Sequence, residues 1–175
     1  MEKLKTKDVL KVIGISGLVI SSVIFPGLPY ALTKIIKPWK NVNRSNLGQI
    51  IKRLERQDLI SITGGNNQTK ILITEKGKQR LLQYDYENLL IKSKKLDGKW
   101  RVVVFDIPEN RKRNRDAFSR KLTQLGFIRL QDSVFATPYN CKNEVDFLCH
   151  YLLISDFVTL LVVDKIDRGE KLFIV

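Results

Sequence analysis

Residues 44–73 run RSNLGQIIKRLERQDLISITGGNNQTKILI, and this stretch decides the fold expected for the first half of the chain. Between Arg44 and Gln57 the apolar residues are spaced i, i+3, i+4 and i+7, which is the period of an amphipathic helix. These residues are Leu47, Ile50, Ile51 and Leu54. Two short runs of strand character follow, Leu59–Ile62 and Ile71–Ile73, and the segment rich in glycine and asparagine between them suits a hairpin turn.

Upstream of Arg44, the pattern predicts a helix over Val9–Phe25 and a short helix over Tyr30–Lys37 that ends before Pro38. Three helices followed by a hairpin is the order of a winged helix-turn-helix. The uncharged run Val12–Leu32 has the length of a membrane span, but its glycine, serine and proline residues would break a helix. We therefore expect a buried helix and no membrane contact, with a membrane-tethered protein as the alternative.

The second half of the chain alternates between strand and helix patterns. Thr74 is placed to cap a helix through Gln83, and a polar connector follows near residues 86–98. Beyond it we expect strands at Trp100–Phe105, Phe127–Leu130, Ser133–Tyr139 and Phe157–Val163, with helices at Asn110–Leu125, stopped by Gly126, and around Val145–Leu152. This is the βαββαβ order of a ferredoxin-like unit. Lys171–Val175 is expected to add an edge strand, within the chain or on a partner subunit.

The expected fold class is therefore α+β with two domains. A winged helix-turn-helix domain occupies residues 1–86, a linker residues 87–98, and a ferredoxin-like dimerisation domain residues 99–175. A chain of 175 residues is long enough for two small domains.

Positive charge is concentrated in the first half of the chain. The formal net charge is +13, and residues 1–98 carry 18 Lys and Arg against 8 Asp and Glu, whereas residues 99–175 carry 13 against 10. Localised positive charge attracts a polyanion, so a nucleic-acid face is expected in the first half. The alternative is that the excess of lysine serves only solubility.

The cysteine and histidine content excludes several classes of site. Cys141 and Cys149 are too few for a disulfide scaffold, and His150 is the single histidine, which excludes a Cys/His zinc finger. A cytoplasmic, reducing location is expected. We interpret Cys149 as a core residue, Cys141 as an inert turn residue, and His150 as structural, because it has no acidic or nucleophilic neighbour in sequence.

Residues 102–139, VVVFDIPENRKRNRDAFSRKLTQLGFIRLQDSVFATPY, resemble the ferredoxin-like unit of CRISPR-associated protein 2. Together with a preceding winged helix and the segment LITEKGKQRLLQY at residues 72–84, the chain is similar to the central part of PaaX-like (phenylacetate-degradation repressor-like) transcription regulators. Members known for binding a coenzyme A thioester carry a further C-terminal domain, which this sequence lacks. The resemblance implies a DNA-binding regulator, and it leaves a small-molecule effector open.

A winged helix inserts its third helix into the major groove, where amides and arginines opposite the apolar stripe contact base edges. We expect base contacts from Ser45, Asn46, Gln49 and Arg53, and phosphate contacts from Arg44, Lys52 and Arg56. The wing tip, which includes Asn66, Asn67 and Lys70, is expected to touch the backbone or the minor groove. The alternative is a polar helix face and turn that are simply solvated.

In the CRISPR-associated family, the aspartate that ends the first strand is the proposed metal ligand near the dimer axis, and Asp106 occupies that position. Two such carboxylates across a two-fold axis could bind one divalent cation and activate a water. The alternative for Asp106 is to accept hydrogen bonds from backbone N–H groups at the strand-to-helix junction. Arg111, Arg113 and Arg115 either bind phosphate or form a solvated helix face.

These observations predict a non-enzymatic, DNA-binding transcriptional regulator, most simply a repressor. It would act as a homodimer on a two-fold symmetric operator in double-stranded DNA and require no cofactor. The alternative is a Mg²⁺-dependent endonuclease that resembles CRISPR-associated protein 2 and uses Asp106. The operator, any effector and the sign of regulation stay open.

Overall fold

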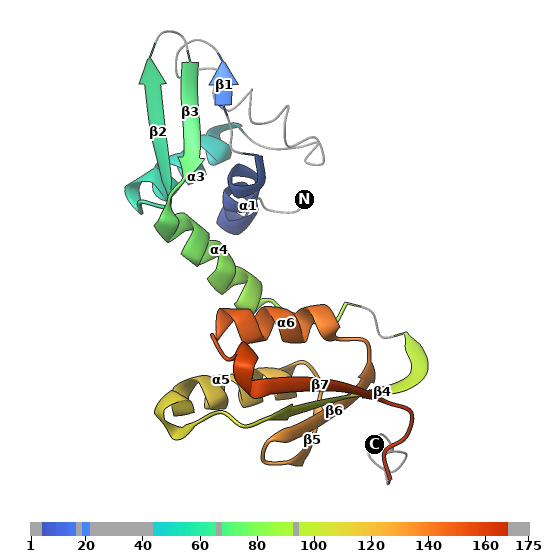
Figure 1. The fold of residues 1–175 in the computed structure, drawn as a ribbon. Coiled ribbons are helices and arrows are strands. Elements are labelled where there is room, and N and C mark those ends of the chain that lie inside the picture. The colour runs from blue at the N-terminus through green and yellow to red at the C-terminus, as the bar shows by residue number, and fades with distance from the viewer. Residues whose placement is uncertain (1–4, 17–18, 22–43, 66–67, 93–94, 168–175) are drawn as a thin grey trace. The chain divides into compact units, whose positions relative to one another are not determined.

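The computed structural model describes residues 5–16, 19–21, 44–65, 68–92 and 95–167. The chain forms two compact units, Met1–Glu87 and Asn88–Val175, and each has its own antiparallel sheet and its own helices (Figure 1). The predicted α+β class is confirmed.

The first unit packs helices against a small sheet. Its elements are α1 (Thr6–Ser16), β1 (Val19–Ser21), α3 (Arg44–Arg56), β2 (Ile60–Gly65), β3 (Gln68–Ile73) and α4 (Glu75–Glu87). The strands lie in the order β1-β3-β2, all antiparallel. The core joins α1, α3 and the two longer strands through side chains that are nearly all inaccessible: Val9, Leu10, Ile13, Leu47, Ile50, Ile51, Leu54, Leu59, Ile60 and Ile71. The predicted helical stripe and hairpin strands are thus confirmed.

The prediction of one helix over Val9–Phe25 was wrong. Helix α1 ends at Ser16, and Val19–Ser21 forms strand β1, which pairs with β3 through Val19 and Lys70. Val19 and Ile20 are β-branched and favour an extended backbone, and pairing with β3, which is distant in sequence, makes them a strand. A partner strand offers them ladder hydrogen bonds, and hydropathy alone did not reveal that strand. The predicted helix at Tyr30–Lys37 lies outside the described residues.

The end of α3 and the start of α4 form one tightly fitted junction. Helix α3 ends in a Schellman motif: the N–H groups of Asp58 and Leu59 donate to the carbonyls of Glu55 and Leu54 at 2.8 and 2.9 Å, and Asp58 has a φ of 58°. Thr74 caps α4, since its Oγ1 accepts from the N–H of Gly77 at 3.0 Å, and it also donates to the Asp58 carbonyl at 2.7 Å. The predicted cap is confirmed, and it also ties α4 to the end of α3.

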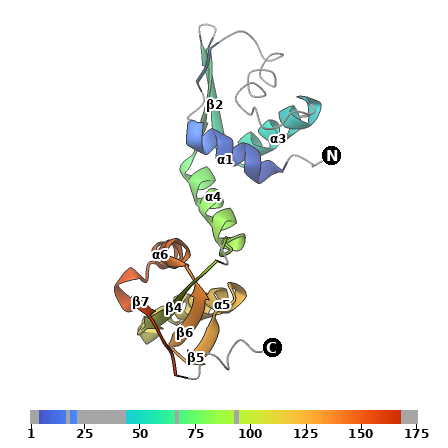
Figure 2. The same ribbon diagram turned by 90° about the vertical axis from the view of Figure 1, so that its right-hand side faces the viewer.

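The second unit is a four-stranded antiparallel sheet with helices between its strands. Its elements are β4 (Leu96–Phe105), a 3-10 turn η2 (Glu109–Arg111), α5 (Lys112–Gln124), β5 (Ile128–Gln131), β6 (Val134–Tyr139), α6 (Lys142–Tyr151), a turn η3 (Ser155–Phe157) and β7 (Val158–Val163). The strands lie in the order β5-β6-β4-β7 (Figure 2). The succession β4-α5-β5-β6-α6-β7 is that of a ferredoxin-like unit, as predicted.

Aromatic side chains fill the core between the sheet and α5. Phe105 of β4 meets Phe118 of α5 edge to face, with ring centroids 5.3 Å apart, and stacks at 6.0 Å on Phe135 of β6. Phe118 and Leu122 are fully buried, as their predicted inward positions require. Helix α5 ends at Gly126, whose φ of 85° and hydrogen bond to the Thr123 carbonyl make it the predicted stop.

Strand β4 begins before the predicted Trp100 and contains an irregular segment. Leu96 pairs with Tyr139 and Arg101 with Thr137, so the residues between them bulge out of the ladder at Gly98, which has a φ of 74°. The Arg101 guanidinium is buried and donates to both carboxylate oxygens of Asp97. This pair holds the pKa of Asp97 well below its ordinary value. A charge that would be costly to bury alone is thereby neutralised inside the bulge.

Two further expectations concern the ends of the chain. In the part of the chain that the structure describes, no helix is both long enough and apolar enough to cross a membrane. Most of the uncharged run Val12–Leu32 and all of the predicted edge strand Lys171–Val175 lie outside the described residues.

Candidate nucleic-acid interface

Helix α3 has one face in the core and one face in solvent. Leu47 and Leu54 are fully buried and Ile51 nearly so, which fixes the rotation of the helix about its axis. With that rotation fixed, Gln49, Lys52, Arg53 and Arg56 are exposed and Asn46 is half-buried. The sequence pattern therefore determined which side chains of α3 face outward.

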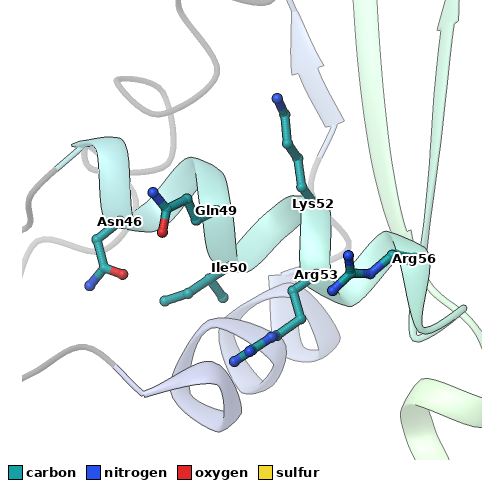
Figure 3. Close-up of a pocket in the computed structure, with 6 residues that line it drawn as sticks. All are labelled: Asn46, Gln49, Ile50, Lys52, Arg53 and Arg56. Carbon is teal, nitrogen blue, oxygen red and sulfur yellow. The ribbon is translucent and has the colours of Figure 1, made fainter.

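The outward face is lined by both amides and cations. Asn46, Gln49, Arg53 and Arg56 follow one another at i, i+3, i+7 and i+10, so they share one side of the helix. A shallow hollow of about 380 Å³ runs along this side, lined by Asn46, Gln49, Ile50, Lys52, Arg53 and Arg56 (Figure 3). In Figure 3, Asn46, Ile50 and Arg53 point to one side of the helix axis and Lys52 to the other. Amide and cationic side chains therefore line the same hollow.

Ile50 is the one lining residue that the sequence interpretation did not assign to this face. It belongs to the apolar stripe and is only 7% exposed, yet it borders the hollow. An apolar group at this position suits contact with a thymine methyl. In the sequence, only the position of Ile50 at the edge of the apolar stripe, next to Gln49 and Arg53, could have indicated that it borders the hollow.

The cations of this face have no acidic partner among the residues that the structure describes. Among the described residues, Lys52, Arg53 and Arg56 form no ion pair and no side-chain hydrogen bond. Exposed side chains without an internal partner keep their full charge available for an external anion. The arrangement can therefore bind a phosphate backbone without first breaking an intramolecular contact.

The other predicted contacts are only partly described. Arg44 and Ser45 lie in the first turn of α3, and their side chains are outside the described part. Lys70 is exposed on β3, between Val19 of β1 and Thr63 of β2 in the strand register. Asn66 and Asn67 connect β2 to β3 and lie outside the described residues.

The three arginines at the start of α5 have different surroundings. Arg111 donates to the Leu153 carbonyl and lies 5.2 Å from the centre of the Phe157 ring, so it ties α5 to the end of α6. Arg115 pairs with Glu109 at 3.0 Å, and this contact lowers the pKa of Glu109. Arg113 is exposed and forms no ion pair with any described residue.

Asp106 follows the end of β4 and is exposed. Its backbone N–H donates to the Phe157 carbonyl at 3.0 Å, whereas its carboxylate accepts no hydrogen bond from the described residues. The alternative in which this carboxylate accepts hydrogen bonds from backbone N–H groups is thus not borne out. Within the described ranges, no three His, Cys, Asp or Glu side chains gather to hold a metal ion.

Both cysteines are buried, and burial raises the pKa of the Cys141 thiol to about 12 and that of Cys149 to about 11. Neither is therefore a thiolate near neutral pH. His150 is exposed, with Nδ1 at 2.8 Å from the Asp146 carbonyl one helical turn earlier.

The comparisons with known proteins concern the second unit. Residues 93–175 match the family model of the PaaX protein central Cas2-like domain. The match supports the resemblance to PaaX-like proteins for this half of the chain, including α5, α6 and the four-stranded sheet. Helix α3 and the hairpin precede the matched residues. No curated protein matches the chain.

Proposed function

We propose that this protein is a DNA-binding transcriptional regulator, most simply a repressor, that acts as a homodimer on a two-fold symmetric operator. The single observation that carries the proposal is the outward face of α3, which combines amides with cations that have no partner among the described residues. The PaaX-like match of the second unit is consistent with a regulator. Binding is proposed to need no metal.

The element order of the first unit supports a winged helix-turn-helix. Helix α3 is followed at once by the β2–β3 hairpin, and β1 completes the sheet against β3. In winged helices such a hairpin lies beside the recognition helix as the wing. We propose that Gln49 and Arg53 contact base edges, while Lys52, Arg56 and Lys70 contact phosphates.

The sheet of the second unit supports a homodimer. Because Phe105 faces α5, its neighbour Val104 faces the opposite side of the sheet, together with its strand partners Val134 and Thr159. Val102 faces the same side and pairs with Leu161, which is 43% exposed. An apolar sheet face that remains partly open is a suitable surface for a second copy of the chain.

Binding to genomic fragments tests the proposal. The purified protein is incubated with pooled genomic DNA in EDTA, and the retained fragments are sequenced. Enrichment of one palindromic motif, with half-sites about 10 base pairs or a multiple apart, is the expected result. Retention of all fragments alike would reject sequence recognition.

Variants of α3 separate base contacts from phosphate contacts. Arg53→Ala should weaken operator binding and relax the sequence preference, whereas Lys52→Ala should weaken binding to all DNA sequences alike. In a dimer, Lys52→Ala removes two phosphate contacts, so the slope of log K against log salt should become smaller by about 2. Lys76→Ala is the matched control, because Lys76 is exposed on α4 and has no ion pair among the described residues.

A Mg²⁺ arm tests the nuclease alternative. The same fragments are incubated with Mg²⁺ or Mn²⁺ and the wild-type or the Asp106→Ala protein. If the DNA remains intact with both proteins, the result supports the proposal of a non-enzymatic regulator. Cleavage by the wild type that Asp106→Ala abolishes would replace the proposal with a nuclease.

A further inference from the structure

A cluster of arginines lies in the second unit, on α5 and β5. A hollow of about 610 Å³ lies between α5 and the β5–β6 turn. Three arginines and two serines line it together with two aspartates: Arg115, Asp116, Ser119, Arg120, Arg129, Asp132 and Ser133. All seven residues are polar or charged, and the cations come from two successive elements, α5 and β5. This volume falls in the range of small-molecule sites, about 300–1,000 Å³.

The arginines of this hollow are held in place by weak contacts. Arg129 pairs with Asp132 at 2.8 Å, but their side chains are 58% and 98% exposed. Exposed pairs of this kind contribute little to stability, about 0–1 kcal/mol, so an incoming anion can replace the carboxylate. Arg120 is exposed and has no ion pair among the described residues.

Arg115 is more firmly placed. Its side chain is 31% exposed, and it contacts Glu109 at 3.0 Å and Asp116 at 3.8 Å. These contacts fix one guanidinium in the wall of the hollow, while Arg120 remains free to close on a ligand. Serine hydroxyls at Ser119 and Ser133 supply neutral donors beside the guanidinium groups.

We propose that this hollow binds the phosphate group of a small phosphorylated molecule. Guanidinium groups donate paired N–H bonds to phosphate oxygens, and several around one space match a group with three or four such oxygens. The aspartates in the wall argue for a small ligand and against a DNA backbone. A continuous phosphodiester chain would pass both carboxylates, whereas a single phosphate or pyrophosphate fits between them.

Titration calorimetry of the full chain with inorganic pyrophosphate, in the absence of DNA, tests the site. The wild type should bind one equivalent. Arg120→Ala should weaken binding at least about tenfold, since a charge-assisted hydrogen bond contributes about 1.5–3 kcal/mol. Arg113→Ala is the matched control, because Arg113 is exposed on the same helix and does not line the hollow.

A variant that should bind pyrophosphate more tightly than the wild type adds a second test. Asp132→Asn removes the carboxylate that competes for Arg129 and should tighten pyrophosphate binding. Failure of the wild type to bind would overturn the site, as would an equal loss in Arg113→Ala and Arg120→Ala, which would show a response to net charge only.

A binding experiment with duplex DNA shows whether the hollow binds a small phosphorylated molecule or the phosphates of a DNA backbone. Anisotropy of a labelled random duplex should respond alike to Arg120→Ala and Arg113→Ala. A selective loss in Arg120→Ala would show that the hollow binds the DNA backbone and would overturn the small ligand. Since the calorimetry contains no DNA, its outcome is independent of whether α3 binds an operator.

Discussion

Replacing Gly77 by alanine should loosen the first unit while leaving the second unit unchanged. A Cβ at Gly77 would lie 2.0 Å from the Leu59 carbonyl oxygen and 2.7 Å from Cγ1 of Ile73. The oxygen cannot move cheaply, because it accepts the Thr74 N–H at 3.1 Å at the start of α4. Overpacking of this kind costs about 1–3 kcal/mol, and loss of the Thr74 bond would add about 1 kcal/mol.

The gain in helix propensity from alanine offsets about 1 kcal/mol, so the net destabilisation of the first unit should be about 1–3 kcal/mol. Gly48→Ala is the matched control: it lies in α3, and its Cβ would meet nothing within 4 Å. That variant should be as stable as the wild type or more stable by about 0.5–1 kcal/mol.

Hydrogen exchange with mass spectrometry measures the two units separately. Exchange limited by global opening of the first unit should accelerate about 5- to 150-fold in Gly77→Ala, as a loss of about 1–3 kcal/mol requires. Peptides from the second unit serve as the internal standard. Wild-type protection of the β2 and β3 peptides in Gly77→Ala would refute the reasoning, since the junction would then tolerate a side chain that the geometry excludes.

Substitutions at three further positions test other features. Leu153 is 74% exposed with a φ of 55°, so Leu153→Gly should stabilise the second unit by up to about 1 kcal/mol in urea unfolding. Thr74→Ala should cost the first unit about 1 kcal/mol by the same assay, whereas Thr74→Ser should retain the cap. The lowered pKa of Asp97 means that its pair with Arg101 stabilises the fold fully above the ordinary value of 3.8 and progressively less below it. The stability difference between wild type and Asp97→Asn should therefore shrink as pH falls below 3.8, which acid titration of the unfolding midpoint measures.

Much of the fold follows from local sequence signals. The spacing of Leu47 and Leu54 predicted α3 and its buried face, because a helical period leaves only one rotation that buries both. Gly126 predicted the end of α5, since its positive φ is inexpensive only for glycine. The same rule does not reveal the ends of α3 and α6, where Asp58 and Leu153 adopt the left-handed conformation. Their cost is offset by Schellman hydrogen bonds that sequence does not display.

Non-local pairing accounts for the main failure. Strand β1 exists because Val19–Ser21 lies beside β3, and the sequence near Val19 does not show which strand will pair with it. The hollow on the second unit was missed for a similar reason. Arg120 and Arg129 belong to different elements, and only the fold brings them to one space. A scan for basic clusters along the sequence selected Arg111, Arg113 and Arg115, and of these only Arg115 lines the hollow.

The basic surfaces of the two units differ more in whether their arginines form internal contacts than in net charge. A charge count directs attention to the first half, but it treats every arginine alike. In the second unit four arginines are already engaged by carboxylates, a carbonyl or a ring: Arg101, Arg111, Arg115 and Arg129. On α3 the cations have no such contacts among the described residues. Among the described residues, no carboxylate pairs with the α3 cations, although Glu55 is exposed on the same helix. A polyanion can therefore contact them without displacing a paired carboxylate, whereas a ligand that binds Arg129 must displace Asp132. This difference suits α3 to a long polyanion, and it suits the second unit to a small ligand with few phosphates that can exchange for Asp132.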